Sequence, residues 1–393
     1  MDKVLQTCLS PALDDNYLSK NNASTQVLYL NKRILSDFFQ NENCCGRTLE
    51  FGVEVDTDIV YIPAGESFQC KMGNGFKTVG MSYKSDYAIL AAWAKSMGSL
   101  VQFEDINCFD GINEEGLALG VFFFPSYAQY QILPEESTES TASEEDISKG
   151  MGPQDFPRWI LSKFTDVDQV KKAIANKEVV VFRSIPNDEA GKPLPFDPLT
   201  VHYIVYDRTG KSIVIEPVEG KLIVHDNPLG IITNSPTFDW HMTNLRNYIA
   251  LDPRNVPSIE IAGETFSQFG QGTGMLGMPG DFTPPARFVR ATVFSQTAIP
   301  STTIEEGIEQ VFHILNNFDI PVGVARAGHE TDYTMFTSAR DPHNLRYYWK
   351  TYEDQTIRMV DLKKLMATGE KNVKTLSTES EQPIVDMTND LKG

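Results

Sequence analysis

The sequence predicts an α+β domain, on three observations: many short strands, a smaller number of helices, and no regular βαβ alternation. The strand signals are strongest in residues 200–236, where three alternating, β-branched runs are separated by short polar turns. A hydrophobic content of 41% over 393 residues is ordinary for a globular chain. A layered α+β domain is therefore expected rather than a doubly wound parallel sheet.

The expected elements follow from the period of the apolar side chains. Residues 24–30 alternate polar and apolar side chains, as a half-buried strand does, and residues 44–51 have the character of a second strand. Helical spacing predicts three helices, the last with a capping-box pair at Thr303 and Glu306; they cover 88–97, 166–176 and 303–318. The three runs within residues 200–236 predict strands at 201–206, 212–216 and 222–225.

The charge of the chain argues against some classes of partner. With 53 acidic and 34 basic residues, the net charge is −19. Such a chain repels nucleic acid backbones and anionic membrane surfaces, so neither is expected as a partner. No apolar run approaches the ~18 residues that a membrane-spanning helix needs, so no membrane insertion is expected.

Two segments differ in composition from the rest of the chain. Residues 1–23 lack the apolar core of a secretory signal and are interpreted as a pro-segment or an N-terminal tail, so that a single domain occupies 24–393. Residues 134–150 are acidic and rich in Ser and Thr, which predicts a mobile surface loop inserted in the domain. The five irregularly spaced cysteines indicate neither a disulfide framework nor a zinc site, so a reducing, cytoplasmic location is expected.

The histidines of the chain do not form a recognisable catalytic or metal-binding pattern. The six histidines are scattered, and none pairs with another at ligand spacing. His202 and His225 lie in predicted strands and His313 on a predicted helix, so each is interpreted as a structural residue. Nucleotide-binding, G-x-S-x-G and H-E-x-x-H signatures are also absent.

Four longer motifs are more specific. They read GRTLEFG, DGINEEGLALG, TNSPTFDWHMTNLRNY and GQGTGMLGMPGDFTPPARFVRA, and they begin at residues 46, 110, 233 and 270. In this order they make the chain, from about Ser24 to about Tyr352, similar to the choloylglycine hydrolase family, which contains bile salt hydrolases and penicillin V acylases. The resemblance implies an N-terminal nucleophile hydrolase, with a four-layer αββα sandwich that cleaves linear amides. It implies no metal or organic cofactor. It also implies a homotetramer, in which residues 245–272 have the length and character of the family's assembly loop.

The family's mechanism explains why these residue types are needed. A free α-amino group acts as base toward the side chain of its own residue, so no histidine is required. A nearby guanidinium favours the ionised nucleophile, and a carboxylate holds the ammonium. The resemblance assigns these two roles to Arg47 and to Glu50, which stands where the family usually has aspartate. It assigns the oxyanion donor to Asn234 and a second active-site arginine to Arg287.

Substrate binding is assigned less completely by the resemblance. Phe123, in the stretch GVFFFP, stands where bile salt hydrolases place an asparagine and penicillin V acylases a tyrosine. Its side chain offers no hydrogen-bond donor, so backbone amides and Asn234 are left to stabilise the oxyanion. The aromatic ring favours the acylase pocket, whereas TNSPTFDWH is closer to the bile salt enzymes.

The nucleophile itself has three possible accounts. The family strand begins with cysteine, and the matching strand here begins with Ser24. Cleavage after Ala23 would expose Ser24 as an active nucleophile; alternatively the chain is an unprocessed or substituted, inactive form. A third account makes Cys8 the nucleophile, but Pro11 then falls early in the first strand, which disfavours central pairing.

The sequence thus predicts a hydrolase of linear amide bonds, such as those of conjugated bile salts, N-acyl amino acids or penicillin V. The expected partner is a small amphipathic amide. The alternative is a catalytically inactive member that binds an amphipathic acyl ligand without cleaving it.

Overall fold

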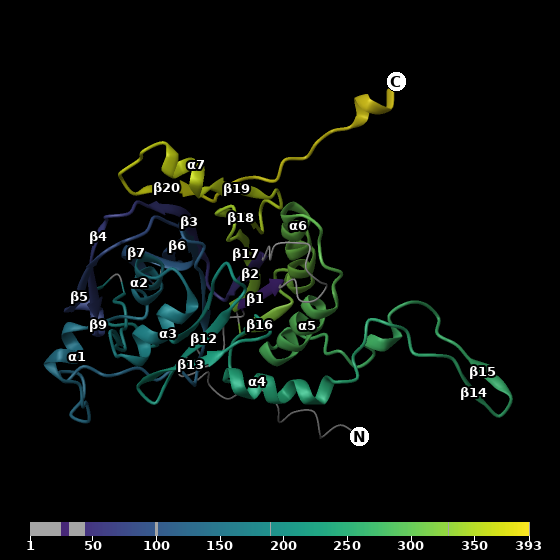
Figure 1. Cartoon of the computed structure of the whole chain (residues 1–393), viewed down its shortest axis with the longest axis horizontal. Helices are drawn as coiled ribbons and strands as arrows, with labels where there is room; N and C mark the ends of the chain where they lie inside the picture. The colour runs from purple at the N-terminus through teal and green to yellow at the C-terminus, as the bar shows by residue number, and fades with distance from the viewer. Residues whose placement is uncertain (1–24, 31–43, 99–100, 189, 329, 393) are drawn as a thin grey trace, which may run out of the picture.

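The computed structural model describes residues 25–30, 44–98, 101–188, 190–328 and 330–392. Two largely antiparallel sheets form the centre of the molecule, with helices on both outer faces (Figure 1). Helices α5 (Pro284–Thr297) and α6 (Ile304–Leu315) pack on the smaller sheet. Helices α2 (Phe156–Lys163) and α3 (Val167–Ala175) lie on the other side, where α2 packs on the larger sheet. The predicted α+β sandwich of four layers is therefore observed.

The smaller sheet has the strand order β1-β2-β17-β18-β19, and β16 pairs with β17 beyond this path. Its strands are antiparallel neighbours. Their bounds are β1 Thr25–Leu30, β2 Cys44–Phe51, β16 Ala325–Ala327, β17 Glu330–Asp341, β18 Arg346–Thr351 and β19 Arg358–Asp361.

The larger sheet has the order β13-β12-β11-β8-β7-β6-β3-β20 and is also antiparallel. Its bounds are β3 Val55–Ile62, β6 Ile89–Met97, β7 Val101–Asn113, β8 Ala118–Phe123, β11 Val201–Tyr206, β12 Ser212–Val218, β13 Lys221–Asp226 and β20 Lys374–Ser377. The three strands predicted from the 200–236 segment are thus confirmed as β11, β12 and β13.

The remaining elements are short. The small sheets consist of β4 Ser67–Met72 with β5 Thr78–Lys84, β9 Gly150–Met151 with β10 Val180–Val181, and β14 Ile259–Ile261 with β15 Glu264–Phe266. The other helices are α1 Glu144–Ser148, α4 Phe238–Asn244 and α7 Leu362–Ala367, and the 3-10 turns are η1 Asn74–Phe76, η2 Leu245–Tyr248, η3 Thr273–Met275, η4 Asn316–Phe318 and η5 Thr388–Lys392. No described helix is long and apolar enough to cross a bilayer.

Alternating side chains of the larger sheet pack into two separate hydrophobic cores, one on each face. On β11, Ile204 and Tyr206 face the core between the two sheets, whereas Tyr203 and Val205 face the core under α2 and α3. This alternation is the period of two that a strand imposes on its side chains. Because both faces of β11 are covered, this strand is apolar at nearly every position.

Two of the three predicted helices are confirmed, and the third is wrong. Asp166 caps α3 by accepting from the backbone of Gln169, and Thr303 and Glu306 form the expected capping box of α6, so both helices are confirmed. The helix predicted over 88–97 is wrong, because these residues form strand β6. The strand lies between β3 and β7 with both faces covered, and a continuous apolar run has no period that separates strand from helix.

The acidic insertion at 134–150 differs from a plain surface loop. Its second half forms α1, where Ser143 and Asp146 make a capping box. In its first half, Glu136 accepts from the backbone of Asn74 at 2.5 Å, and Ser140 donates to the carbonyl of Ile132 at 2.6 Å. Polar side chains therefore fix this segment by hydrogen bonds where apolar burial is scarce.

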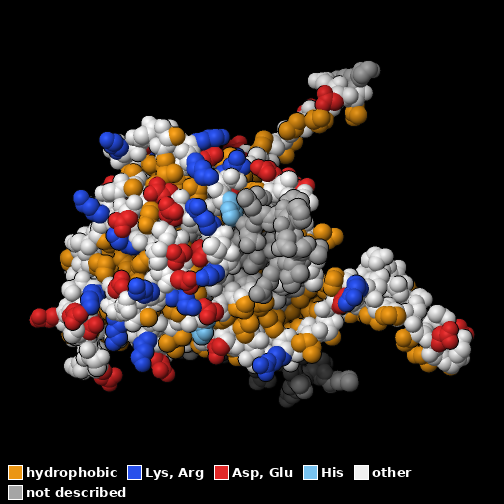
Figure 2. Space-filling model, viewed as in Figure 1, with side chains coloured by type: hydrophobic (Ala, Val, Ile, Leu, Met, Phe, Trp, Pro, Cys, Tyr) orange, Lys and Arg blue, Asp and Glu red, His pale blue; other side chains and the backbone are white. Residues whose placement is uncertain are grey.

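An arm, residues 249–276, projects from the body and carries the β14–β15 hairpin (Figure 1). Hydrophobic side chains lie along it in Figure 2, whereas acidic and basic side chains alternate over the body. The exposed large apolar side chains of the arm are Ile249, Val256, Ile259, Ile261, Phe266, Phe269 and Leu276. An apolar surface of this kind is typical of an interface.

A glycine allows β2 to pack closely against α6. A Cβ atom at Gly46 would lie 2.4 Å from Val311 Cγ1 and 2.7 Å from the Ser338 carbonyl oxygen. We expect Gly46→Ala to lower the free energy of unfolding by about 1–3 kcal/mol, because β17 and α6 cannot both give way. Urea unfolding measures this change. Gly270→Ala is the control, since its Cβ would meet nothing within 4 Å; equal midpoints for both variants would contradict the close packing.

Candidate active site

The candidate site begins where β1 meets β2. Thr25 lies opposite Leu49 and Val27 opposite Arg47, so the N-terminal end of β1 lies beside the part of β2 that carries Glu50. Ser24 precedes Thr25 in the sequence but lies outside the described residues, as does Cys8. The two strand predictions for 24–30 and 44–51 are confirmed for β1 and β2.

Glu50 is a buried carboxylate with an incomplete set of partners. Its side chain is 1% exposed, and Oε1 accepts from Thr334 Oγ1 at 2.8 Å. Oε2 has no hydrogen-bond partner within the described part of the chain. Burial raises the pKa of Glu50 to about 7, although the charge of Arg287 opposes this shift. The carboxylate therefore has an unused acceptor and a reason to attract a cation.

Arg47 is buried between the two sheets. Its guanidinium lies 5.1 Å from the ring centre of Phe109 and 4.8 Å from that of Phe122, and Nη1 donates to the Phe109 carbonyl at 3.1 Å. Burial, followed by the charge of Arg340, lowers the pKa of Arg47 to about 9. Aromatic faces and a carbonyl thus hold a charge that bulk water cannot reach.

Asn234 and Arg287 meet directly. Arg287 Nη2 donates to Asn234 Oδ1 at 2.8 Å, and Asn234 Nδ2 donates to the Phe123 carbonyl at 2.7 Å. Both side chains are 1% exposed. The first turn of α5 positions Arg287, whose Nε donates to the carbonyl of Phe282 at 2.9 Å. Burial lowers the pKa of Arg287 to about 10, and the charge of Glu50 acts in the opposite direction.

Phe123 ends β8 and borders an apolar cavity of about 120 Å³. Its ring meets that of Phe51 edge to face at 5.9 Å. Arg47 also lines this cavity, and most of the other lining side chains are apolar: Leu49, Phe51, Val55, Met97, Phe103, Phe109, Val121, Phe122, Leu199 and Val201. An apolar pocket beside a few converging polar groups is the usual form of a ligand site.

The structure thus brings together all five predicted site residues that it describes. Arg287 bonds to Asn234, which bonds to the Phe123 carbonyl, and the charge of Arg287 acts on Glu50. Arg47 joins through the cavity and through its charge on Glu50. The hydroxyl of Thr334 completes the group, and sequence reasoning missed it, because it lies 284 residues from Glu50 along the chain.

Sequence reasoning also missed the partners of the histidines. His202 and His225 lie in β11 and β13 and His313 on α6, as predicted. His202 bonds to the carbonyl of Thr233, next to Asn234, and to the buried Glu216. His241 bonds to the carbonyl of Asn234 itself. A signal was present, since an acid within the apolar run SIVIEPV needs partners when it is buried.

The raised pKa of Glu50 predicts a pH-dependent stability. Folding raises the pKa of this carboxyl from 4.5 to about 7. Its contribution to stability is therefore fully present below pH 4.5 and is lost as pH rises through about 7. In the chain that retains residues 1–23, we compare the free energy of unfolding of Glu50→Gln with that of the wild type. We expect the difference between them to rise in favour of the variant by about 2–3 kcal/mol between pH 5 and pH 8. Urea unfolding at both pH values measures the difference. The control variant is Glu309→Gln, which makes the same change at an exposed acid. A gap between wild type and variant that does not change with pH would contradict the burial argument.

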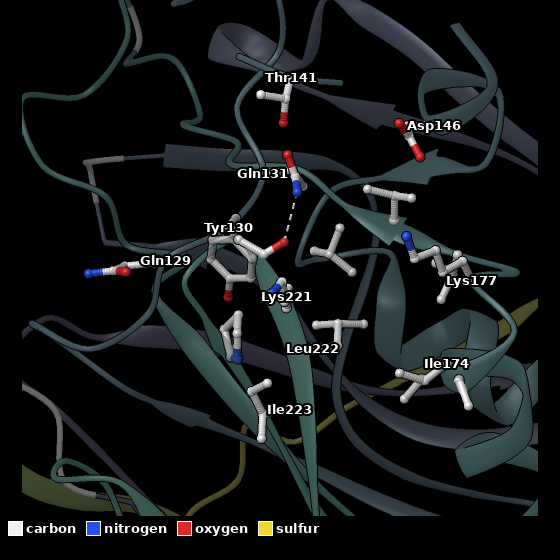
Figure 3. A pocket seen from close by; sticks show the side chains of 16 residues that line it. Gln129, Tyr130, Gln131, Thr141, Asp146, Ile174, Lys177, Lys221, Leu222 and Ile223 are labelled. Carbon is white, nitrogen blue, oxygen red and sulfur yellow. Dashed lines mark hydrogen bonds between the residues drawn. The ribbon is translucent and has the colours of Figure 1, made fainter. Parts of the chain in front are cut away.

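A second cavity, of about 430 Å³, lies at the β13 edge of the larger sheet (Figure 3). Its buried polar groups bond to the protein itself. Gln131 Nε2 donates to the Gly220 carbonyl at 3.0 Å, and Tyr130 Oη lies 2.9 Å from the carbonyl oxygens of Leu199 and Val201, which share its single hydrogen. Lys177 and Lys221 are exposed at its border. The cavity therefore lacks the unsatisfied, converging groups that the Glu50 region has. Nowhere in the described ranges do three or more His, Cys, Asp or Glu side chains gather as a metal site.

Comparison with known proteins agrees with the family resemblance that the sequence motifs indicate. The family described as "Linear amide C-N hydrolases, choloylglycine hydrolase family" matches residues 33–375, a range that begins after Ser24. A bile salt hydrolase/transferase of Clostridium perfringens is 34% identical over 330 residues, which cover 81% of this chain and 88% of that protein. A penicillin V acylase of Pectobacterium atrosepticum is 25% identical and covers 81% of this chain and 77% of its own. The crystal structure of a mutant conjugated bile acid hydrolase from Clostridium perfringens aligns with a TM-score of 0.74 at 29% identity, over 93% of this chain and 100% of that chain.

Proposed function

Because the chain belongs to the choloylglycine hydrolase family of linear amide C–N hydrolases, we propose that it hydrolyses a small amphipathic amide with residue 24 as the nucleophile. The resemblance predicted from four sequence motifs is confirmed by the family match and by the solved neighbour. The observation that carries the proposed site is the bond between Arg287 and Asn234, together with the charge of Arg287 on Glu50, which lies beside the N-terminal end of β1.

The first step forms an acyl-enzyme. Cleavage after Ala23 would free the α-amino group of Ser24, which removes the proton of the Ser24 hydroxyl as Oγ attacks the amide carbonyl carbon. Asn234 Nδ2, oriented by Arg287, donates to the oxyanion that forms; one such donor is worth roughly 3 kcal/mol. The C–N bond then breaks, and the ammonium returns its proton to the leaving amine.

The second step releases the acid. The same α-amino group takes a proton from water, the hydroxide oxygen attacks the ester carbonyl, and Ser24 Oγ leaves with that proton. Glu50 supports both steps, because its Oε2 is available to accept from the terminal ammonium. The positive charge would also stabilise the ionised form of Glu50 against its burial. Cleavage of the pro-segment is thereby expected to reduce the pH-dependent penalty described above.

The substrate class follows from the cavity and from the relatives. Apolar walls beside Phe123 suit a hydrophobic acyl group, and Arg47 places a positive charge at the same cavity. The related proteins are a bile salt hydrolase/transferase and a penicillin V acylase, so conjugated bile salts and penicillin V are the first substrates to assay.

Intact mass and activity together test this function. We expect the purified protein to lose residues 1–23, and a chain beginning at residue 24, as serine or as Ser24→Cys, to hydrolyse glycine-conjugated cholate or penicillin V. Retention of the segment, with no turnover of any amide by either form, would favour a protein that binds an acyl ligand without cleaving it.

The arm, residues 249–276, supports a homotetramer as the assembled form. Its apolar side chains have no cover within the described chain, and seven of the large ones are exposed. We expect the protein to sediment as a tetramer and the double variant Ile261→Ser, Phe266→Ser to sediment as a smaller species. Val79→Ser is the control, because Val79 is 60% exposed on the body. A wild type that sediments as a monomer at micromolar concentration would contradict the assignment.

A cytoplasmic location stays a prediction. It is supported by Cys44, Cys45, Cys70 and Cys108, which are buried free thiols in the described chain.

A further inference from the structure

Glu216, in the middle of β12, is a buried carboxylate that receives three donors. Oε1 accepts from the backbone N–H of Phe238 at 2.8 Å and lies 3.3 Å from His202 Nδ1, and Oε2 lies 3.3 Å from His225 Nε2. The side chain is 1% exposed. Burial opposes its ionisation, but the hydrogen bonds from His202 and His225 prevail and lower the pKa of Glu216 to about 2. Glu216 is therefore an anion that only accepts hydrogen bonds.

His202 connects this anion to the site. Its Nε2 lies 2.9 Å from the carbonyl oxygen of Thr233, the residue before Asn234. A carbonyl oxygen only accepts hydrogen bonds, so Nε2 carries a hydrogen and donates to it, while Nδ1 faces the carboxylate of Glu216. The ring also stacks on Phe124, with 4.2 Å between centres and 7° between planes. His202 is thus held between a carboxylate, an aromatic face and the backbone of the site.

His241 holds the next carbonyl. Its Nε2 donates to the Asn234 carbonyl oxygen at 2.9 Å, and its ring stacks on Phe288 of α5 at 4.6 Å. Burial lowers the pKa of His241 to about 4, so the ring is neutral and its one hydrogen is on Nε2. Two consecutive carbonyls, those of Thr233 and Asn234, are therefore fixed by imidazoles from different elements.

We propose that His202, Glu216 and His241 form a clamp that sets the orientation of the Asn234 amide toward the reacting carbonyl. They are positioning residues and not bases. The clamp rests on the proposed function, because it deepens the role of Asn234 in amide hydrolysis. The Asn234 side-chain amide bonds to Phe123 and Arg287, and its backbone is held at the carbonyls of Thr233 and Asn234. It therefore needs no reorganisation when the oxyanion forms.

The clamp makes a kinetic prediction that separates positioning from folding. His202→Phe keeps a ring on Phe124 but removes both ring nitrogens, and we expect kcat to fall by about 100-fold with KM within about twofold of the wild type. His202→Gln, which keeps one donor toward Thr233, is expected to recover part of that loss. His225→Gln is the matched control, because His225 bonds to the same carboxylate but to no backbone of the site. Equal losses in kcat for His225→Gln and His202→Phe would overturn the proposal.

A second readout does not depend on activity. In protein labelled with ¹⁵N-histidine, we expect His202 and His241 each to carry a hydrogen on Nε2, the atom that faces a backbone carbonyl. Hydrogen exchange of the Asn234 side-chain amide is expected to be at least about tenfold faster in His202→Gln than in the wild type. A His202 without a hydrogen on Nε2, or unchanged exchange, would overturn the clamp. If the protein hydrolyses no amide, the proposed function fails while these measurements still decide the clamp.

Discussion

Replacing Ser24 with alanine in the chain that begins at residue 24 is expected to lower kcat for amide hydrolysis by about 10⁶-fold. The substitution removes the attacking oxygen but keeps the terminal amine, Glu50, Asn234 and Arg287 in place. Without a nucleophile no acyl-enzyme forms, so the remaining groups can only polarise the amide. Product formation from glycine-conjugated cholate or penicillin V, followed by chromatography, measures the loss.

Two matched variants make this result specific. Ser24→Cys is expected to be at least about tenfold faster than Ser24, because a thiol of pKa ~8.5 loses its proton to the amine far more readily than a hydroxyl does. In the full chain, Cys8→Ser is expected to leave activity unchanged. Full activity in Ser24→Ala, or loss of activity in Cys8→Ser, would show that the nucleophile is a residue other than Ser24.

Replacing Asn234 with leucine is the second large effect that we expect, a fall in kcat of about 10²–10³-fold. Leucine has a similar volume but neither donates to an oxyanion nor accepts from Arg287 Nη2. Because the interaction develops with the charge of the oxyanion, the loss should appear in kcat more than in KM. Steady-state kinetics over a range of substrate concentrations separates the two constants.

The control for this variant is Asn247→Leu, which changes the same side chain at an exposed position of η2. It is expected to leave both constants unchanged. Asn234→Leu also removes the acceptor of Arg287 Nη2 in a buried place, so the unfolding of this variant is measured in parallel. A folded Asn234→Leu protein with normal kcat and raised KM would show that Asn234 binds substrate instead of stabilising the oxyanion.

The parts of the fold that could be predicted are those that local chemistry decides. The hairpins of β11, β12 and β13 were accessible because turn residues and alternation lie within a few positions of each other. The caps of α3 and α6 were accessible for the same reason. Strand β6 was not, because its cover on both faces comes from other layers of the molecule, which a run of apolar residues does not reveal.

The candidate site divides in a similar way. Its residue types followed from motifs, but its contacts did not, since Arg287 lies 53 residues from Asn234 and Thr334 lies 284 residues from Glu50. His202 was correctly assigned to a strand and interpreted as structural. The hairpin register that pairs Tyr203 with Ile215 also places His202 opposite Glu216, so this contact could have been inferred.

The central claim, that a chain terminus freed at Ser24 supplies both nucleophile and base, is tested most directly by trapping the acyl-enzyme. Protein mixed with p-nitrophenyl phenylacetate is quenched in acid, digested with trypsin and analysed by mass spectrometry. The account predicts an acyl group on the peptide 24–32, with Ser24 as its first residue. An adduct on any other peptide, or turnover by protein whose peptide still begins at Asn21, would contradict it.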